Sequence, residues 1–202
     1  MKKLIVLLAL LFTSIAQAEG YIGAGIGQSK AIDLPGCAAV TSAVSCSVTD
    51  TDTGIKVFGG YQFNENGAVE ISYIDLGKVT ANANFIISGI PVSSQAERKS
   101  HGFDLGVIGI LPVNNQFSFL GRAGMFLWSA DFSVTASGGG VTLSNSQSAS
   151  GNSLSYGIGA KYDFDKSIGL RAEFQRFKDV GDKNTTGQSD VDLLSISLVL
   201  RF

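Results

Sequence analysis

The sequence is poor in the residues that most catalytic and metal sites require. Its 202 residues include one histidine, two cysteines and three prolines, and only 16% of them are charged. One histidine and two cysteines are too few for a metal site built from several His and Cys ligands. The formal net charge of −2 gives no basic footprint of the kind that binds nucleic acid. The composition therefore predicts no metal ion, no cofactor and no nucleic-acid partner.

Long apolar runs are also scarce. After the first 16 residues, no run approaches the roughly 18 apolar residues of a membrane-spanning helix, which excludes a helical membrane protein. Residues 1–18 have the three parts of a secretory signal peptide: two lysines, the apolar stretch Leu4–Phe12 and the cleavage motif Ala16-Gln17-Ala18. We therefore expect residues 1–18 to be removed and residues 19–202 to form the exported domain.

The two cysteines lie close together in a polar segment that contains proline and glycine. Export would place Cys37 and Cys46 in an oxidising compartment, where such a pair is expected to form a disulfide. The link would close a short loop and would not be a redox site, because the spacing is not Cys-x-x-Cys. Two free thiols are the alternative.

The rest of the chain shows a hydrophobic period of two, which is typical of strands. Eight alternating segments occur at about residues 20–27, 55–63, 69–73, 103–111, 117–127, 153–164, 168–175 and 191–202. Tight turns rich in Asn, Asp, Pro and Gly alternate with long connections at about residues 30–51, 79–98, 134–150 and 179–190. This arrangement predicts an all-β fold, an eight-stranded antiparallel up-and-down β-barrel.

The non-apolar face decides between a soluble barrel and a membrane barrel, because the two place their apolar faces on opposite sides. That face combines about ten glycines with few charges, which would make a poor solvated surface but suits a narrow lumen. Aromatic residues near the turn ends fit an interfacial girdle. We therefore predict a transmembrane barrel whose lumen holds an ionic network of seven residues: Lys56, Glu70, Asp104, Arg122, Lys161, Arg171 and Glu173.

Several short segments also resemble a known family. In consistent order along the exported domain, they resemble the N-terminal transmembrane domain of OmpA proteins: Gly20–Ala24, Val57–Gln62, Val69–Tyr73, Gly121–Gly124, Trp128–Asp131, Leu170–Gln175 and Leu194–Phe202. The resemblance implies the outer membrane of a Gram-negative bacterium, with its lipids and lipopolysaccharide as partners. It also implies that Phe202, a terminal aromatic residue, is the signal read by the barrel assembly machinery.

Two departures from the family limit what the resemblance implies. The chain stops at Phe202, without the peptidoglycan-binding domain common in that family, so tethering to the cell wall is not implied. In the family's lumen gate of two acids and two bases, Glu70 and Arg171 match one acid and one base. Lys161 stands in place of the second acid and Ile108 in place of the second base.

Three functions remain open. The first is a structural or surface-interaction role through long extracellular loops, whose ligand the sequence does not name. The alternative is a narrow, gated pore of low conductance. A lipid-modifying enzyme is third, because His101 is the only candidate base and its strand parity separates it from Ser100 and Asp104. Within the second loop, Ala81–Val92 is unusually apolar and either extends a hairpin above the membrane or contacts a partner.

Overall fold

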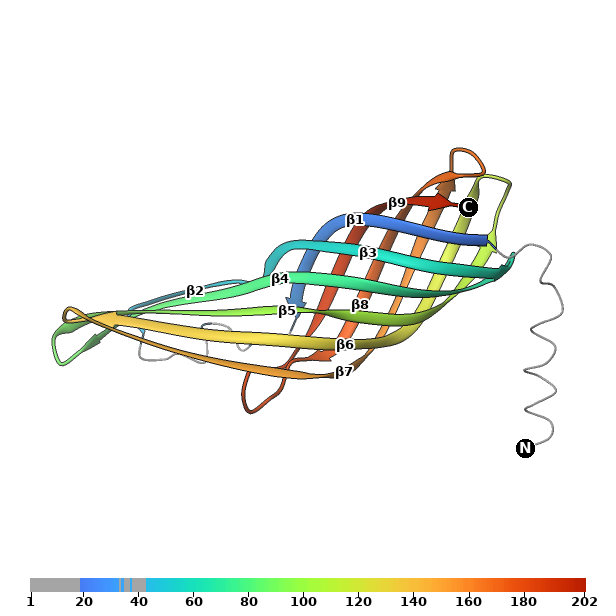
Figure 1. Cartoon of the computed structure of the whole chain (residues 1–202). Coiled ribbons are helices and arrows are strands. Elements are labelled where there is room, and N and C mark those ends of the chain that lie inside the picture. The colour runs from blue at the N-terminus through green and yellow to red at the C-terminus, as the bar shows by residue number, and fades with distance from the viewer. Residues whose placement is uncertain (1–18, 33, 35–36, 38–42) are drawn as a thin grey trace, which may run out of the picture.

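The computed structural model describes residues 19–32, 34, 37 and 43–202, and nearly all of them form antiparallel strands. The strands are β1 (Glu19–Ile32), β2 (Ser45–Thr49), β3 (Thr51–Asn64), β4 (Gly67–Ile87), β5 (Ile90–Pro112), β6 (Phe117–Gly138), β7 (Val141–Asp163), β8 (Ile168–Val180) and β9 (Ser189–Arg201). All except β2 close into a ring, because β1 pairs with β3 and β9, and β4 pairs with β5 (Figure 1). The predicted all-β, eight-stranded antiparallel barrel is confirmed.

No helix among the described residues is long and apolar enough to cross a membrane. The predicted signal peptide, residues 1–18, lies outside the described residues and stays a prediction.

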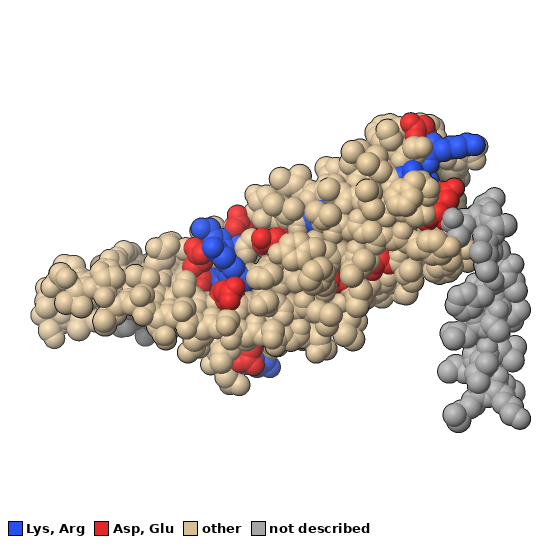
Figure 2. Space-filling model, in the orientation of Figure 1, with Lys and Arg blue, Asp and Glu red and all other residues tan. Residues whose placement is uncertain are grey.

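The two faces of the barrel are oriented as the period of two predicted. On β9, Leu198 is 49% exposed on the outer face, while its neighbour Ser197 is 1% exposed in the lumen. Figure 2 shows charged side chains gathered mainly at two levels of the barrel, with a largely uncharged surface between them. An outer apolar band with charges only at its borders is the surface that a bilayer requires.

Aromatic side chains lie near both borders of this band. At the end with the tight turns, the rings of Phe117 and Phe119 are 5.1 Å apart, and those of Tyr162 and Phe164 are 5.3 Å apart. Towards the other end, Tyr73 packs against Phe103 at 5.4 Å. These pairs fit the girdles that anchor barrels at the two membrane interfaces.

Two of the predicted long loops are extensions of strands. The hairpin extension expected as one alternative for Ala81–Val92 is confirmed, whereas the loop predicted at residues 134–150 is wrong. β4 and β5 continue to a tight turn at Ser88–Gly89, and β6 and β7 continue to one at Gly139–Gly140. β2, within the first predicted loop, adds a strand along the edge of β4. Ser, Thr, Asn and Ala dominate these segments and give little hydrophobic alternation, yet their backbones pair as well as any others. The strands form a sheet that projects beyond the barrel (Figure 1).

The outer apolar band generates the first prediction. Leu198→Arg places a cation on the lipid face and should destabilise the barrel by about 2–4 kcal/mol, the cost found near the bilayer midplane. Refolding into lipid, followed by heat-modifiable gel mobility, measures the folded fraction. Gln28→Arg, on the same face near the extracellular border, should cost only about 0–1 kcal/mol. Equal folding of Leu198→Arg and the parent would mean that the faces are assigned the wrong way round.

Candidate functional site

Six charged side chains from five strands meet in the middle of the lumen. We call them the ionic cluster; its members are Lys56 on β3, Glu70 on β4, Asp104 on β5, Arg122 on β6, and Arg171 and Glu173 on β8. All six are buried. Three are cations and three are acids, so the cluster is neutral when every group is ionised.

Glu70 is the centre of the cluster. Its carboxylate accepts two hydrogen bonds from Arg171, at 2.7 and 3.2 Å, and one from Arg122 at 2.9 Å. The hydroxyls of Tyr21 and Ser72 each donate a further bond at 3.1 Å. Charge-assisted bonds of this kind are stronger than neutral ones, and five of them converge on one carboxylate.

The second acid of the ionic cluster, Glu173 on β8, lies beside Glu70. Lys56 and Arg171 pair with both carboxylates. Glu173 Oε2 lies 2.9 Å from Lys56 Nζ and 2.9 Å from Arg171 Nε. Lys56 also donates to the amide oxygen of Gln175 at 2.9 Å. A lysine ammonium with a carboxylate and an amide as acceptors has replaced much of the hydration that it lost.

The third acid, Asp104, completes the cluster on the side of β5. Its carboxylate accepts hydrogen bonds from the guanidinium of Arg122 and the hydroxyl of Ser155. Arg122 therefore bridges Asp104 and Glu70, and it also lies 3.6 Å from Glu173. Each charge of the cluster thus has at least one partner of opposite sign.

Glycines give these long side chains their room. Gly60 and Gly106 flank Glu70 in the ladder, and the Cβ of an alanine at Gly106 would lie 3.1 Å from Arg122 Nη2. At Gly159, beside Glu173, an added Cβ would lie 2.8 Å from the Cγ of that glutamate. The lumen of an eight-stranded barrel is just wide enough for side chains, so a long charged side chain fits where the neighbouring residues are glycines.

Apolar layers lie above and below the ionic cluster. Towards the tight turns, Tyr21, Phe58, Ile108, Leu120 and others form one packed layer. Towards the extended strands, Phe126, Trp128, Phe177, Leu193 and others form a second layer. The Phe58 ring also supports the cluster from below, because the Arg171 guanidinium lies 3.9 Å from its centroid.

Small cavities occur at both ends of the lumen. One of about 20 Å³ lies on the tight-turn side, and one of about 10 Å³ lies on the other. Each has room for about one water molecule. Such cavities are far too small for a continuous column of water.

Lys161 is the one predicted network residue that the structure does not bring into the ionic cluster. Its ammonium lies 3.2 Å from the carboxylate of Asp163, near the tight-turn rim, and Arg201 binds the same carboxylate. Lys161 was expected at the depth of Glu70 and Arg171. In the ladder Lys161 does lie opposite Arg171, and repulsion between the two cations favours the acid two residues away.

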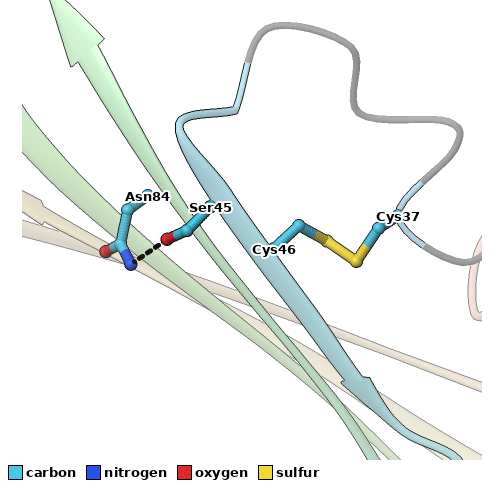
Figure 3. Close-up of a disulfide and its surroundings, with 4 residues drawn as sticks. All are labelled: Cys37, Ser45, Cys46 and Asn84. Carbon is cyan, nitrogen blue, oxygen red and sulfur yellow. Dashed lines mark hydrogen bonds between the residues drawn. A yellow bond between two sulfur atoms is a disulfide. The ribbon is translucent and has the colours of Figure 1, made fainter.

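The predicted disulfide is confirmed. Cys37 and Cys46 are bonded, with their Cα atoms 5.6 Å apart, and the link attaches the first loop to β2 (Figure 3). Next to it, Asn84 of β4 donates a hydrogen bond of 2.9 Å to Ser45 Oγ. The disulfide therefore lies on the projecting sheet, well away from the ionic cluster.

Phe202 lies next to the first strand of the barrel. Its N–H donates to the carbonyl of Gly20 at 3.0 Å, and the N–H of Gly20 returns a bond at 3.2 Å. The Phe202 side chain is exposed on the outer surface. Its recognition by the assembly machinery stays a prediction.

The sequence did not predict several residues that form hydrogen bonds with the ionic cluster. Tyr21, Ser72, Ser155 and Gln175 bind its charges, yet none of them is ionised at neutral pH. Their inward parity was the available signal, because each lies on the same face of its strand as the charged residues. Parity alone does not say which hydroxyl or amide lies at the depth of the charges.

A closed barrel with an apolar outer band and a packed ionic lumen defines a class, the small integral β-barrels of outer membranes. Within that class, this chain belongs to the family of the OmpA-like transmembrane domain, whose model matches residues 15–202. The protein accordingly resides in the outer membrane of a Gram-negative bacterium.

Relatives and solved structures agree with this assignment. The chain is 27% identical to outer membrane protein A of Shigella flexneri, over 95% of the chain and 52% of that protein. It is 27% identical to the Salmonella typhi protein, over 76% of the chain and 41% of the relative. It thus spans about half the length of the curated relatives it matches.

Two solved barrels have the same fold at low sequence identity. Ail of Yersinia pestis aligns with a TM-score of 0.50 and 18% identity, over 92% of this chain and 99% of Ail. Neisserial surface protein A aligns with a TM-score of 0.50 and 16% identity, over 92% of this chain and 99% of that protein. Both likenesses concern the fold alone.

The position of Glu70 generates the second prediction. Glu70→Ala would leave Arg171 and Arg122 without their shared carboxylate, and breaking a buried pair in this way costs about 3–5 kcal/mol. Water entering to solvate these cations should also produce fluctuating ion conductance in planar bilayers, where the parent should be silent. Urea unfolding in lipid vesicles measures the free energy of unfolding.

Two variants serve as comparisons. Glu70→Gln should be milder, because its amide oxygen still accepts a hydrogen bond. Glu97→Ala removes an acid from an exposed ion pair and should change the free energy of unfolding by at most about 1 kcal/mol. If Glu70→Ala matches the parent in stability and shows no conductance, Glu70 does not hold the lumen closed, and the pair of Arg122 with Glu173 becomes the better candidate.

The third prediction concerns the disulfide between Cys37 and Cys46. Reduction should leave the barrel folded, because the link closes a short loop outside the ring of strands. The first loop should then be cut faster by added protease, while heat-modifiable mobility stays unchanged. Loss of barrel folding on reduction, or free thiols in protein isolated from membranes, would contradict this account.

Proposed function

We propose that this barrel is a closed membrane anchor that holds an extracellular sheet for contact with a partner. The observation that carries the proposal is the sheet itself, formed by β2 and the far ends of β4 to β7. It projects from the rim with the long strands, which faces the outside of the cell in outer-membrane barrels (Figure 1).

The projecting sheet has no charged side chain beyond the extracellular charged level. Residues 43–49, 79–96 and 132–153 contain no Asp, Glu, Lys or Arg. A polyanion such as the heparin analogue named with the Ail structure would meet no basic side chain there. Contact through this sheet therefore depends on apolar surface and on uncharged polar groups.

The tip of the sheet is apolar and exposed. Ile86, Ile87 and Ile90 flank the turn between β4 and β5, and Val141 and Leu143 follow the neighbouring turn. The two turns lie close together, because a Cβ at Gly139 would lie 3.6 Å from Ile90. An exposed apolar cluster this far from the membrane band is typical of a contact surface.

The lumen supports an anchor rather than a pore. An ion crossing it would have to displace two packed apolar layers and separate paired charges, and both steps are costly. The gated pore nevertheless remains the alternative, and the bilayer recordings described for Glu70→Ala test it.

Enzymatic activity is the third candidate and has the least support. His101 lies on the outer face, with its ring 6.3 Å from that of Tyr73, whereas Ser100 and Asp104 point into the barrel. Mass analysis of lipid A from cells with and without the protein tests a lipid-modifying activity.

The apolar tip generates the fourth prediction. Cells that display the protein should adhere to an apolar surface more than cells without it, at low and high salt alike, because no charges take part. The triple variant Ile86→Ser, Ile87→Ser, Ile90→Ser should lose most of this gain. Val113→Ser removes an exposed valine from a tight turn on the opposite rim and serves as the matched control.

Surface amounts and heat-modifiable mobility should be equal among these variants. Adherence that is unchanged in the triple variant, or that falls steeply with added salt, would contradict a contact made by the apolar tip.

A further inference from the structure

A cleft of about 420 Å³ lies on the extracellular side, outside the ionic cluster and away from the tip. It lies between the base of the projecting sheet and the loop at residues 181–188 that joins β8 to β9. Its walls are largely apolar and include Val48, Val79, Ala81, Ala96 and Phe132. Its volume is within the range of about 300–1,000 Å³ that is typical of small-molecule sites.

Two cations line this cleft. Arg98 of β5 is only 7% exposed, while Lys183 of the loop is exposed. The guanidinium of Arg98 donates to the carbonyl of Gly187 at 3.1 Å and to the hydroxyl of Ser189. These acceptors hold the guanidinium in place but do not neutralise it.

Arg98 differs from the other buried cations in this respect. Lys56, Arg122 and Arg171 each lie within 3 Å of a carboxylate in the lumen, and Lys161 lies 3.2 Å from the carboxylate of Asp163. Among the described residues, no carboxylate lies within 4.0 Å of Arg98. Burying a cation without a counter-ion is costly, so an anion at this position would be strongly favoured.

Within the part of the chain that the structure describes, the acids nearest to Arg98 in sequence or around the cleft are engaged elsewhere. Glu97 points to the opposite face of β5, where it pairs with two exposed lysines. Asp50 pairs with an exposed lysine at 4.0 Å. Hydrogen bonds from the backbone N–H of Asn184 and from Thr185 hold the pKa of Asp182 below its ordinary value.

We propose that this cleft binds a single-chain amphiphile with an anionic headgroup, a carboxylate or a phosphate. The headgroup binds Arg98, whose planar guanidinium suits both anions, and Lys183 adds a second cation at the mouth. The chain lies along the apolar wall formed by β4, β5 and β6. The bound amphiphile is held outside the membrane band, above the apolar layer that closes the lumen on this side.

The test measures binding of four ten-carbon probes to the full barrel in lipid nanodiscs, with empty nanodiscs subtracted. Decanoate represents a free fatty acid and decyl phosphate represents a lipid phosphate, while decanol and decyltrimethylammonium lack the anion. Isothermal titration should show saturable binding of at least one of the two anionic probes, at one per chain. The preferred anion identifies the source, and the uncharged and cationic probes should bind at least about tenfold more weakly.

Three variants locate the site. Arg98→Gln keeps a hydrogen-bond donor but loses the charge, and it should weaken binding at least about tenfold. Ala96→Trp fills the cleft without changing Arg98, and it should also abolish most of the binding. Lys99→Gln removes a neighbouring cation that is exposed and paired with Glu97, so its affinity should stay within about twofold of the parent.

Heat-modifiable mobility verifies that each variant is folded, and Ala96→Trp keeps the test decisive if Arg98→Gln does not fold. Three results would overturn the proposal. They are the absence of saturable binding above empty nanodiscs, binding of decanol as tight as that of the anionic probes, and unchanged affinity in folded Arg98→Gln.

Discussion

Charge neutrality inside a narrow lumen is the constraint on which the rest of this structure depends. An eight-stranded barrel leaves its inward side chains no bulk water, so every ionised group must find its partner among the others. Three cations and three acids meet this requirement around Glu70. The glycines beside them, the hydroxyls that bind them and the apolar layers on both sides all serve the same cluster. Leu198 and the other outward residues need only be apolar.

The ionic cluster draws some of its charges from other positions than the lumen gate that the resemblance to the family implies. On that resemblance Ile108 stands in the place of one base; it lies in the apolar layer, and its direct partner in the ladder is Arg122. On the same resemblance Lys161 stands in the place of one acid, and in the structure Glu173 on the next strand supplies an acid to the cluster. The cluster therefore still contains equal numbers of cations and acids, although some of them come from other strands than the family's gate implies. A neutral, closed lumen depends on the sum of the charges and their depth more than on particular positions.

A closed lumen and an extended outer sheet make different demands on the sequence. The barrel must alternate strictly, because one face meets lipid and the other meets packed side chains. The projecting sheet meets solvent, so small polar residues suffice there and backbone pairing sets its shape. The base of this sheet is the exception: Phe132, Ala96 and Arg98 form a cleft between the sheet and the last loop. Both proposed contact surfaces lie in this extracellular part, and neither uses the lumen.

The sequence by itself determined the eight barrel strands, their antiparallel order, the face that meets lipid and the inward position of the charges. A period of two and the alternation of short and long connections are local signals, and they are readable because lipid imposes them strand by strand. The disulfide was also predictable, since only two cysteines were present. Only the tertiary structure decided that Lys161 pairs with Asp163, that residues 134–150 are mostly strand, and that Arg98 is buried with no carboxylate of the described residues within 4.0 Å. Each of these depends on depth in the barrel or on backbone pairing between distant strands, and side-chain periodicity contains neither.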